Sequence, residues 1–152
     1  VIMNRISSDS SKKTKEAARF LAEKILKKPS KKLALIIGLT GDLGAGKTTF
    51  IQGFLKGVGL KKRITSPTFV IFKRFKIHDS RFKSIYHIDC YRLTPKELAV
   101  LDFQEIINNP QNIVLIEWAE KIKKILPKSA IWIKFAHTKN LNQRTIKIAT
   151  SG

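Results

Sequence analysis

The chain has 152 residues, of which 30 are Lys or Arg and 11 are Asp or Glu, so its net charge is +19, and 43% of the residues are hydrophobic. This length and composition predict one domain, residues 1–152, with a proper core, while a single cysteine excludes a disulfide framework and a cysteine-cluster metal site. No apolar run approaches the ~20 residues of a membrane span and no secretory leader is evident, so we expect a soluble protein of the reducing cytoplasm, without membrane partners.

The first predicted element is a helix within "SSDSSKKTKEAARFLAEKILKK", which opens with hydroxyl and acidic residues suited to capping. Helical spacing assigns its mostly apolar face to Ala17, Phe20, Leu21, Lys24 and Ile25. The following "KLALIIGL" predicts a strand that is buried on both faces. A second helix is expected from Lys47 to about Gly57, where Gly57 and Gly59 end it.

The second half of the chain predicts two hairpins and two short helices. "TFVIFKRFKI" and "RFKSIYHID" form the first hairpin around "HDS", and "AIWIKFAH" and "RTIKIAT" form the second. Between them lie a helix in "TPKELAVLDFQEIIN", with Thr94 as N-cap, a buried strand in "NIVLIEW" and a short helix in "AEKIKKIL". This alternation indicates a three-layer α/β domain whose central sheet is mixed and mainly parallel, with antiparallel hairpins.

A glycine-rich segment between the first buried strand and the next helix fits the spacing G-x-x-x-x-G-K-[ST]. Its residues are Gly41, Asp42, Leu43, Gly44, Ala45, Gly46, Lys47 and Thr48. Such a loop directs backbone N–H groups at anionic oxygens, with the help of the helix N-terminus. Lys47 would reach the β- and γ-phosphates, Thr48 would ligate Mg²⁺, and Thr49 would support the α-phosphate. The alternative is a chance glycine-rich turn, but the strand before and the helix after favour a nucleoside triphosphate with Mg²⁺.

Two acids at strand ends are candidates for the chemistry at that triphosphate, because ligands bind at the carboxyl ends of strands in open α/β sheets. Glu117 ends "NIVLIE" and could hold the metal's water shell or orient the attacking water. Asp89 ends "YHID" and could ligate Mg²⁺ directly or through water; a buried structural pair with Arg or Tyr is its alternative. His87, like His78 and His137, is more typical of a packed or surface histidine than of a catalyst.

A third candidate is the loop "ITSPTF", where nucleotide switches often carry a hydroxyl near the γ-phosphate. Thr65, Ser66 and Thr68 could supply it, although a plain turn is equally consistent. The guanine-specific motif [NT]-K-x-D is absent, because "TKNL" at 138–141 has no acid at the last position. A GTPase of the common type is therefore disfavoured, and ATP is the expected nucleotide. Nothing resembles a second substrate pocket or an arginine-rich lid, which disfavours a small-metabolite kinase.

Four segments, "GDLGAGKTTF", "SPTF", "HIDCYRL" and "IEWAEK", occur in the order and spacing of one family, and the chain resembles the bacterial TsaE (YjeE) ATPases over nearly its whole length. The resemblance implies a P-loop NTPase fold and ATP hydrolysis in tRNA threonylcarbamoyladenosine biosynthesis. It also implies action on the TsaD–TsaB complex, which transfers a threonylcarbamoyl group to tRNA.

The resemblance also implies roles for individual residues. Lys47 and Thr48 match the phosphate and metal positions, and Asp89 matches the acid of the family's H-x-D-x-Y-R segment. The remaining matches are Glu117 and Trp118 as the E-W pair, Ser66 and Thr68 in the switch-like loop, and Thr14 on the first helix near the nucleotide base. Cys90 fills a variable position, where a buried, inert thiol is expected.

The strong positive charge has two open interpretations. It could bring the protein to tRNA, directly or through the partner complex, or it could reflect a lysine-rich composition spread over solvated faces. A basic RNA-binding module whose loop only binds nucleotide is therefore the second alternative function, beside the small-metabolite kinase.

Overall fold

The computed structural model describes residues 2–27, 32–42, 44, 46–60, 72–140 and 142–150. The strands are β1 (Ile2–Ser8), β2 (Leu35–Thr40), β3 (Phe72–Lys76), β4 (Ser84–Asp89), β5 (Asn112–Glu117), β6 (Ile131–His137) and β7 (Arg144–Thr150). The helices are α1 (Ser11–Leu26), α2 (Lys47–Gly57), α3 (Pro95–Val100), α4 (Phe103–Ile107) and the 3₁₀ helix η1 (Ala119–Ile125).

All of these strands belong to one sheet, in the order β1-β7-β6-β2-β5-β4-β3. The central strands β6, β2, β5 and β4 run parallel to one another. At the two sides, β7 pairs with β6, β1 with β7 and β3 with β4, each in antiparallel orientation. The predicted mixed sheet with a parallel centre and antiparallel hairpins is therefore confirmed. The parallel register aligns the carboxyl ends of β4 and β5, with Asp89 opposite Glu117.

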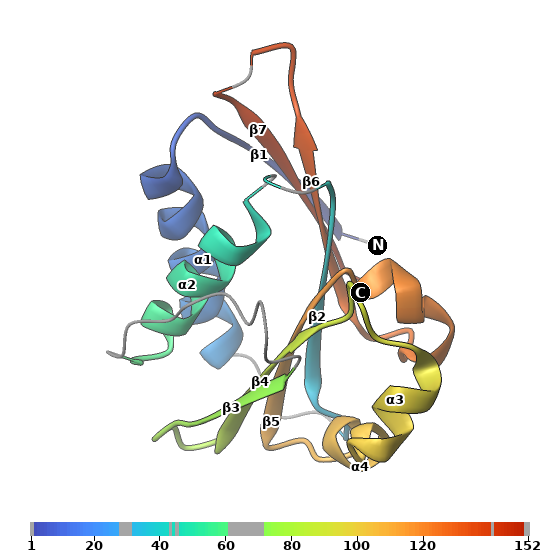
Figure 1. The fold of residues 1–152 in the computed structure, drawn as a ribbon. Coiled ribbons are helices and arrows are strands. Elements are labelled where there is room, and N and C mark those ends of the chain that lie inside the picture. Colours follow the sequence, from blue (N-terminus) through green and yellow to red (C-terminus); the bar gives the residue numbers. More distant parts are fainter. Residues whose placement is uncertain are drawn as a thin grey trace.

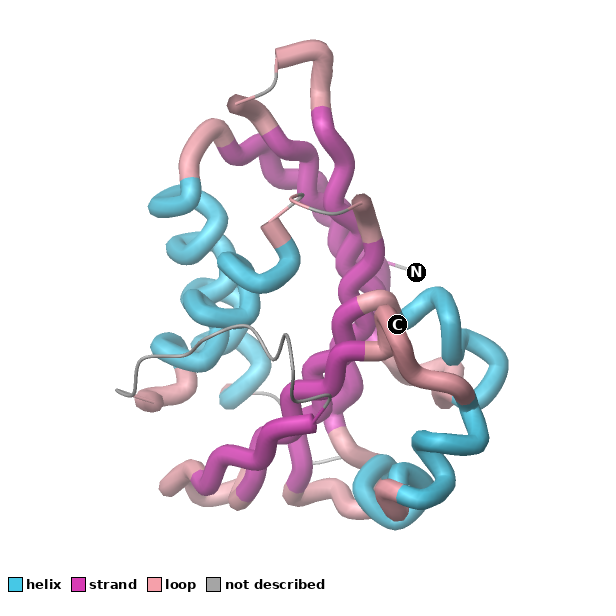
Figure 2. Tube along the Cα trace, viewed as in Figure 1, coloured by secondary structure: helices cyan, strands magenta, loops and turns pink. Residues whose placement is uncertain are grey.

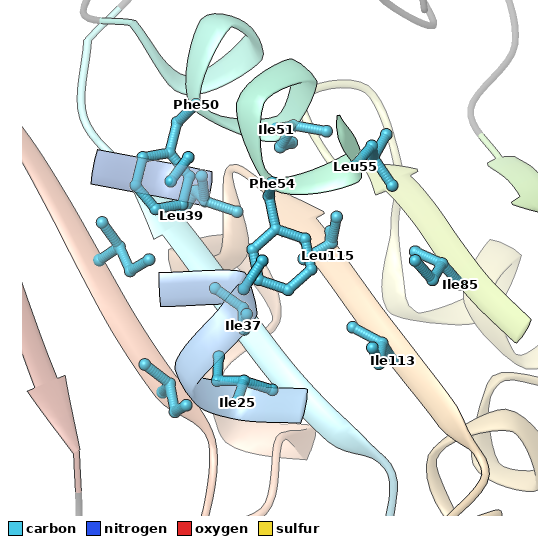
Figure 3. Packing of buried hydrophobic residues seen from close by; sticks show 14 of the residues in the cluster. Ile25, Ile37, Leu39, Phe50, Ile51, Phe54, Leu55, Ile85, Ile113 and Leu115 are labelled. Carbon is cyan, nitrogen blue, oxygen red and sulfur yellow. The ribbon is translucent and has the colours of Figure 1, made fainter. Parts of the chain in front are cut away.

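Helices cover both faces of the sheet, which confirms the predicted three layers. In Figure 1, α1 and α2 lie on one side of the strands, and α3 and α4 lie on the other. The tube in Figure 2 shows the same separation of helices by the sheet. Each face has its own apolar cluster. Figure 3 shows the cluster beneath α2, where Phe50 and Phe54 pack over Ile37, Leu39 and Leu115 of the sheet.

The face that α1 buries differs from the predicted one. The buried side chains are Thr14, Ala18, Ala22 and Ile25, whereas Phe20 is 59% exposed. The reason is the close approach of α1 to α2: a Cβ added at Gly53 would lie 2.5 Å from the Lys15 carbonyl oxygen, and one at Gly57 would lie 2.8 Å from Ala22 Cβ. Only small residues fit between helices this close, so the alanines face α2 and the phenylalanine faces outward.

Three elements differ from the sequence-based expectation. The segment "TPKELAVLDFQEIIN" forms two helices, because Asp102 adopts a left-handed conformation with φ of 54° that interrupts the helix, although Thr94 caps α3 as predicted. The last short helix is a 3₁₀ helix. The strand β1 was not predicted, because its local sequence pattern does not indicate a strand. It is formed by pairing with β7, which lies far along the chain.

None of the helices in the described part of the chain is both long enough and apolar enough to cross a membrane.

Candidate functional site

The glycine-rich segment leads from the end of β2 to the start of α2 (Figure 1), and we call residues 41–48 the glycine loop. Gly41, Gly44 and Gly46 all have positive φ, at 135°, 74° and 101°. At Gly41 a Cβ would lie only 2.5 Å from the Phe135 carbonyl oxygen of β6. A side chain there would be both strained and excluded, so the backbone of the loop requires glycine at this position. Leu43 and Ala45 lie outside the described residues.

Lys47 begins α2, and its side chain folds back over the loop. The ammonium donates hydrogen bonds to the carbonyl oxygens of Gly41 and, at 3.0 Å, Asp42. It also lies 4.1 Å from the centroid of the Trp118 ring. The side chain is buried, and this burial lowers the pKa of Lys47, while the nearby Glu117 carboxylate acts in the opposite direction. A buried cation held at a glycine loop is suited to bind an anion.

Glu117 at the end of β5 connects the loop to the neighbouring strand. Its Oε1 accepts a hydrogen bond from the Thr48 hydroxyl at 3.0 Å, and its Oε2 lies 2.8 Å from His87 Nε2 on β4. Glu117 and His87 are both buried. The structure thus brings together the predicted pair Thr48 and Glu117, and Thr49 follows in the first turn of α2, half-buried.

Asp89 ends β4 directly beside Glu117 in the sheet register. It is half-buried, and its Oδ1 accepts a hydrogen bond from the Tyr91 backbone N–H at 2.9 Å. Burial raises the pKa of Asp89 above its ordinary value of 3.8; the Tyr91 N–H opposes this rise, and the Glu117 carboxylate adds to it. Asp89, Glu117 and the Thr48 hydroxyl are hard oxygen donors, the ligand type that Mg²⁺ prefers, and they lie at the adjacent ends of β4 and β5 and at the start of α2.

The raised pKa of Asp89 predicts a pH-dependent stability. Folding favours the protonated carboxyl, so its contribution to stability is full below the unfolded pKa and is lost as the pH rises through the folded pKa. Without nucleotide or Mg²⁺, we expect Asp89→Asn to have a higher Tm than the wild type at pH 7, with a smaller difference near pH 4. Asparagine keeps the oxygen that accepts from Tyr91, and thermal unfolding at both pH values measures the difference.

The matched control for this prediction is Asp9→Asn, since Asp9 is an exposed acid that pairs with Lys13. The Tm difference between Asp9→Asn and the wild type should not grow in the same way between pH 4 and pH 7. A lower Tm for Asp89→Asn at pH 7 would contradict the assignment of an unfavourably buried charge.

Two residues from distant parts of the chain border the glycine loop. Thr14 of α1 is buried, and its Cγ2 would lie 4.0 Å from a Cβ at Gly46, while its hydroxyl is hydrogen-bonded to that of Ser8 at 2.8 Å. Arg144 of β7 donates to the Gly44 carbonyl oxygen at 3.2 Å. The predicted Thr14 therefore lies at the loop, presenting its methyl group, and Arg144 is an additional neighbour that sequence reasoning missed.

Trp118 follows Glu117 and has φ of 57°, an uncommon conformation for a bulky residue. Its ring contacts the Lys47 ammonium on one side and packs against Tyr91, with ring centroids 4.9 Å apart. Backbone strain of this kind is retained where the surrounding structure specifies it, often at functional sites. Trp118, which the resemblance implied as half of the E-W pair, thus lies in the group of residues around Lys47.

The remaining candidates are resolved as follows. Thr65, Ser66, Pro67 and Thr68 lie outside the described residues. His78 and His137 are exposed, as predicted for surface histidines. Cys90 is buried, as predicted, and burial raises the pKa of its thiol to about 12. His87 is packed in the interior but also contacts Glu117, and strand alternation, which places it on the same face as Asp89, was the available signal.

Comparison with known proteins identifies one family. The family model described as "Threonylcarbamoyl adenosine biosynthesis protein TsaE" matches residues 8–146. A tRNA threonylcarbamoyladenosine biosynthesis protein TsaE from Haemophilus influenzae is 42% identical over 113 residues, covering 74% of this chain and 68% of that protein. The corresponding protein from Rickettsia conorii is 39% identical over 145 residues, covering 94% and 76%.

Among solved structures, Bacillus subtilis YdiB is similar to this chain with a TM-score of 0.77 and 29% sequence identity, over 100% of this chain and 88% of that one. This similarity supports the fold described above. Since the family model spans most of the sequence, the chain belongs to the TsaE family of tRNA threonylcarbamoyladenosine biosynthesis proteins.

Proposed function

We propose that this protein is a Mg²⁺-dependent ATPase of the cytoplasm that assists threonylcarbamoyladenosine modification of tRNA by acting on a TsaD–TsaB type complex. The observation that carries the proposal is the hydrogen bond of 3.0 Å between Thr48, at the end of the glycine loop, and Glu117, at the end of β5. It unites the predicted phosphate loop with a strand-end acid, the two parts that a triphosphate-cleaving site requires.

In this proposal the chain's own residues bind and orient the nucleotide. Backbone N–H groups of the glycine loop and the start of α2 receive the phosphates. The Lys47 ammonium gains an anionic partner in place of the Gly41 and Asp42 carbonyls, which offsets the cost of its burial. Trp118 holds the Lys47 side chain close to the loop, and Thr14 borders the nucleotide from α1.

Thr48, Asp89 and Glu117 are the residues that would hold Mg²⁺ or its water shell. When bound, the ion would neutralise charge on the phosphate oxygens. The two acids differ in setting, and this suggests a division of labour. Glu117 is buried and tied to the loop through Thr48, whereas Asp89 is half-buried. We assign Glu117 to the loop side, where it orients the attacking water, and Asp89 to the metal.

A reconstituted reaction tests the proposal. Purified TsaD and TsaB type proteins, tRNA and a threonylcarbamoyl donor should give repeated modification only when this chain and ATP are both added. A non-hydrolysable ATP analogue should not replace ATP, because the proposal assigns a role to cleavage. The net charge of +19 suggests that binding of tRNA should be measured in the same assay over a range of salt concentrations.

Two outcomes would favour the alternatives. ADP production that depends on a small metabolite and needs no partner protein would indicate a kinase. Binding of tRNA by this chain alone with a steep salt dependence, together with full function of Glu117→Ala, would indicate an RNA-binding module that only binds nucleotide.

A further inference from the structure

His87 makes the contact that most needs an explanation in the described part of the chain. It lies on β4 and is fully buried, with an exposed fraction of 0%. Its Nε2 is 2.8 Å from Glu117 Oε2, while the other carboxylate oxygen, Oε1, accepts the hydrogen bond of Thr48. The two oxygens of Glu117 therefore have separate partners, one within the sheet and one at the glycine loop.

The hydrogen bonds assign the tautomer of the imidazole. A carboxylate only accepts, so His87 Nε2 carries the proton and donates it to Glu117. Among the residues that the structure describes, the buried Nδ1 has no hydrogen-bond partner. A proton on Nδ1 would leave a buried donor without an acceptor, so the geometry favours the arrangement with Nε2–H directed at Glu117.

Packing alone does not account for a histidine at this position. Its register partner on β5 is Leu115, and Ile85 precedes it on the same face of β4; both are buried in the apolar cluster beneath α2. An apolar side chain would fit these surroundings and would leave no buried nitrogen without a hydrogen-bond partner. A buried polar group that breaks the local pattern is expected where it serves a function.

We propose that His87 is a positioning residue for Glu117, holding its carboxylate so that Oε1 remains directed at Thr48 and the glycine loop. This inference rests on the proposed function, in which Glu117 serves the nucleotide. Without the Nε2–H donor, the Glu117 carboxylate has a competing partner in the Lys47 ammonium. Of the acids around Lys47, Glu117 is the one whose charge raises the pKa of Lys47 most. His87 thus keeps Glu117 from neutralising the cation that the phosphates need.

The test compares His87→Gln with His87→Leu. Glutamine places an N–H near the position of Nε2, whereas leucine fills the space without a donor. We expect His87→Leu to lower kcat of the Mg²⁺-dependent ATPase about 10- to 100-fold, the usual effect of losing such a supporting hydrogen bond, with a smaller change in KM. His87→Gln should recover most of the loss. Equal activities of the two variants, or full activity of His87→Leu, would overturn the proposal.

Two further measurements separate folding and function from positioning. If His87→Leu fails to unfold cooperatively, His87→Asn replaces it, because asparagine is polar but too short to reach Glu117; it should be as impaired as leucine. If the wild type shows no ATPase activity at all, the proposed function fails, and the positioning contact is then tested by a spectroscopic signature alone.

That signature is the ¹⁵N NMR spectrum of the three histidines. The wild type should contain one imidazole with a slowly exchanging Nε2–H, which His87→Gln removes and Glu117→Gln shifts. The exposed acid Glu105 provides the control, since Glu105→Gln should leave this signal unchanged. An imidazole at position 87 that exchanges rapidly between tautomers, or that does not respond to Glu117→Gln, would overturn the inference.

Discussion

Replacing Lys47 by alanine is expected to lower ATP affinity about 10- to 100-fold and turnover by a further factor of about 10² to 10³. Hydrogen bonds to charged groups contribute roughly 1.5–3 kcal/mol, and loss of a preorganised donor to developing charge typically costs this much in rate. Lys47 is the buried cation of the site, held by the Gly41 and Asp42 carbonyls and the Trp118 ring. Calorimetric titration with ATP and a phosphate-release assay measure the two effects.

Lys56→Ala is the matched control, because Lys56 belongs to the same helix but is exposed in its last turn. It should bind and hydrolyse ATP like the wild type. Unchanged affinity and turnover in Lys47→Ala would remove the glycine loop from the proposed function. Lys47→Arg should also be impaired, because a planar guanidinium cannot replace a compact ammonium in this buried position.

Replacing Glu117 by glutamine or alanine should leave ATP binding largely intact and lower hydrolysis about 10²- to 10⁴-fold, the usual contribution of a positioned acid or base. The reason is its location: the carboxylate accepts from Thr48 at the edge of the loop, whereas the loop backbone and Lys47 remain in place. Glutamine has the same shape but only one accepting oxygen, so it cannot serve both Thr48 and His87. Rapid-quench measurement of a single turnover separates cleavage from binding.

The exposed acid Glu105 again supplies the control, and Glu105→Gln should retain full hydrolysis. Normal turnover in Glu117→Ala would exclude Glu117 from the mechanism. A joint loss of ATP affinity and hydrolysis would instead indicate that Glu117 acts mainly by holding Thr48 in place.

The parts of the site that the sequence predicts well are those with a local pattern. The spacing from Gly41 to Thr48 specifies a turn, and the acids Asp89 and Glu117 end apolar runs, so parallel pairing brings them together. Arg144 had no such pattern, and for His87 strand alternation indicated only that it shares a face with Asp89. His87 acquires its role only through the register of β4 against β5, and Arg144 only through the position of the β6–β7 hairpin over the loop.

The same distinction applies to the fold. The strands β2 and β5 and the helix α2 follow from continuous apolar or periodic segments. The buried face of α1 does not, because the alanines that pack on α2 are less hydrophobic than Phe20, and their advantage appears only when Gly53 and Gly57 face them. The break at Asp102 was missed since the helical pattern runs through it, although a left-handed residue stops the helix there.

The pairing of β1 with β7 has a consequence for biogenesis. Ser8 at the end of β1 holds Thr14, and Arg144 at the start of β7 contacts Gly44, so both strands contribute to the surroundings of one loop. A nascent chain on the ribosome already holds Ser8 and Thr14 and can assemble β2, α2 and β5 before Arg144 has been synthesised. The nucleotide cradle would therefore gain its full enclosure only after translation has delivered the final hairpin, so that a partly synthesised chain would hold ATP poorly.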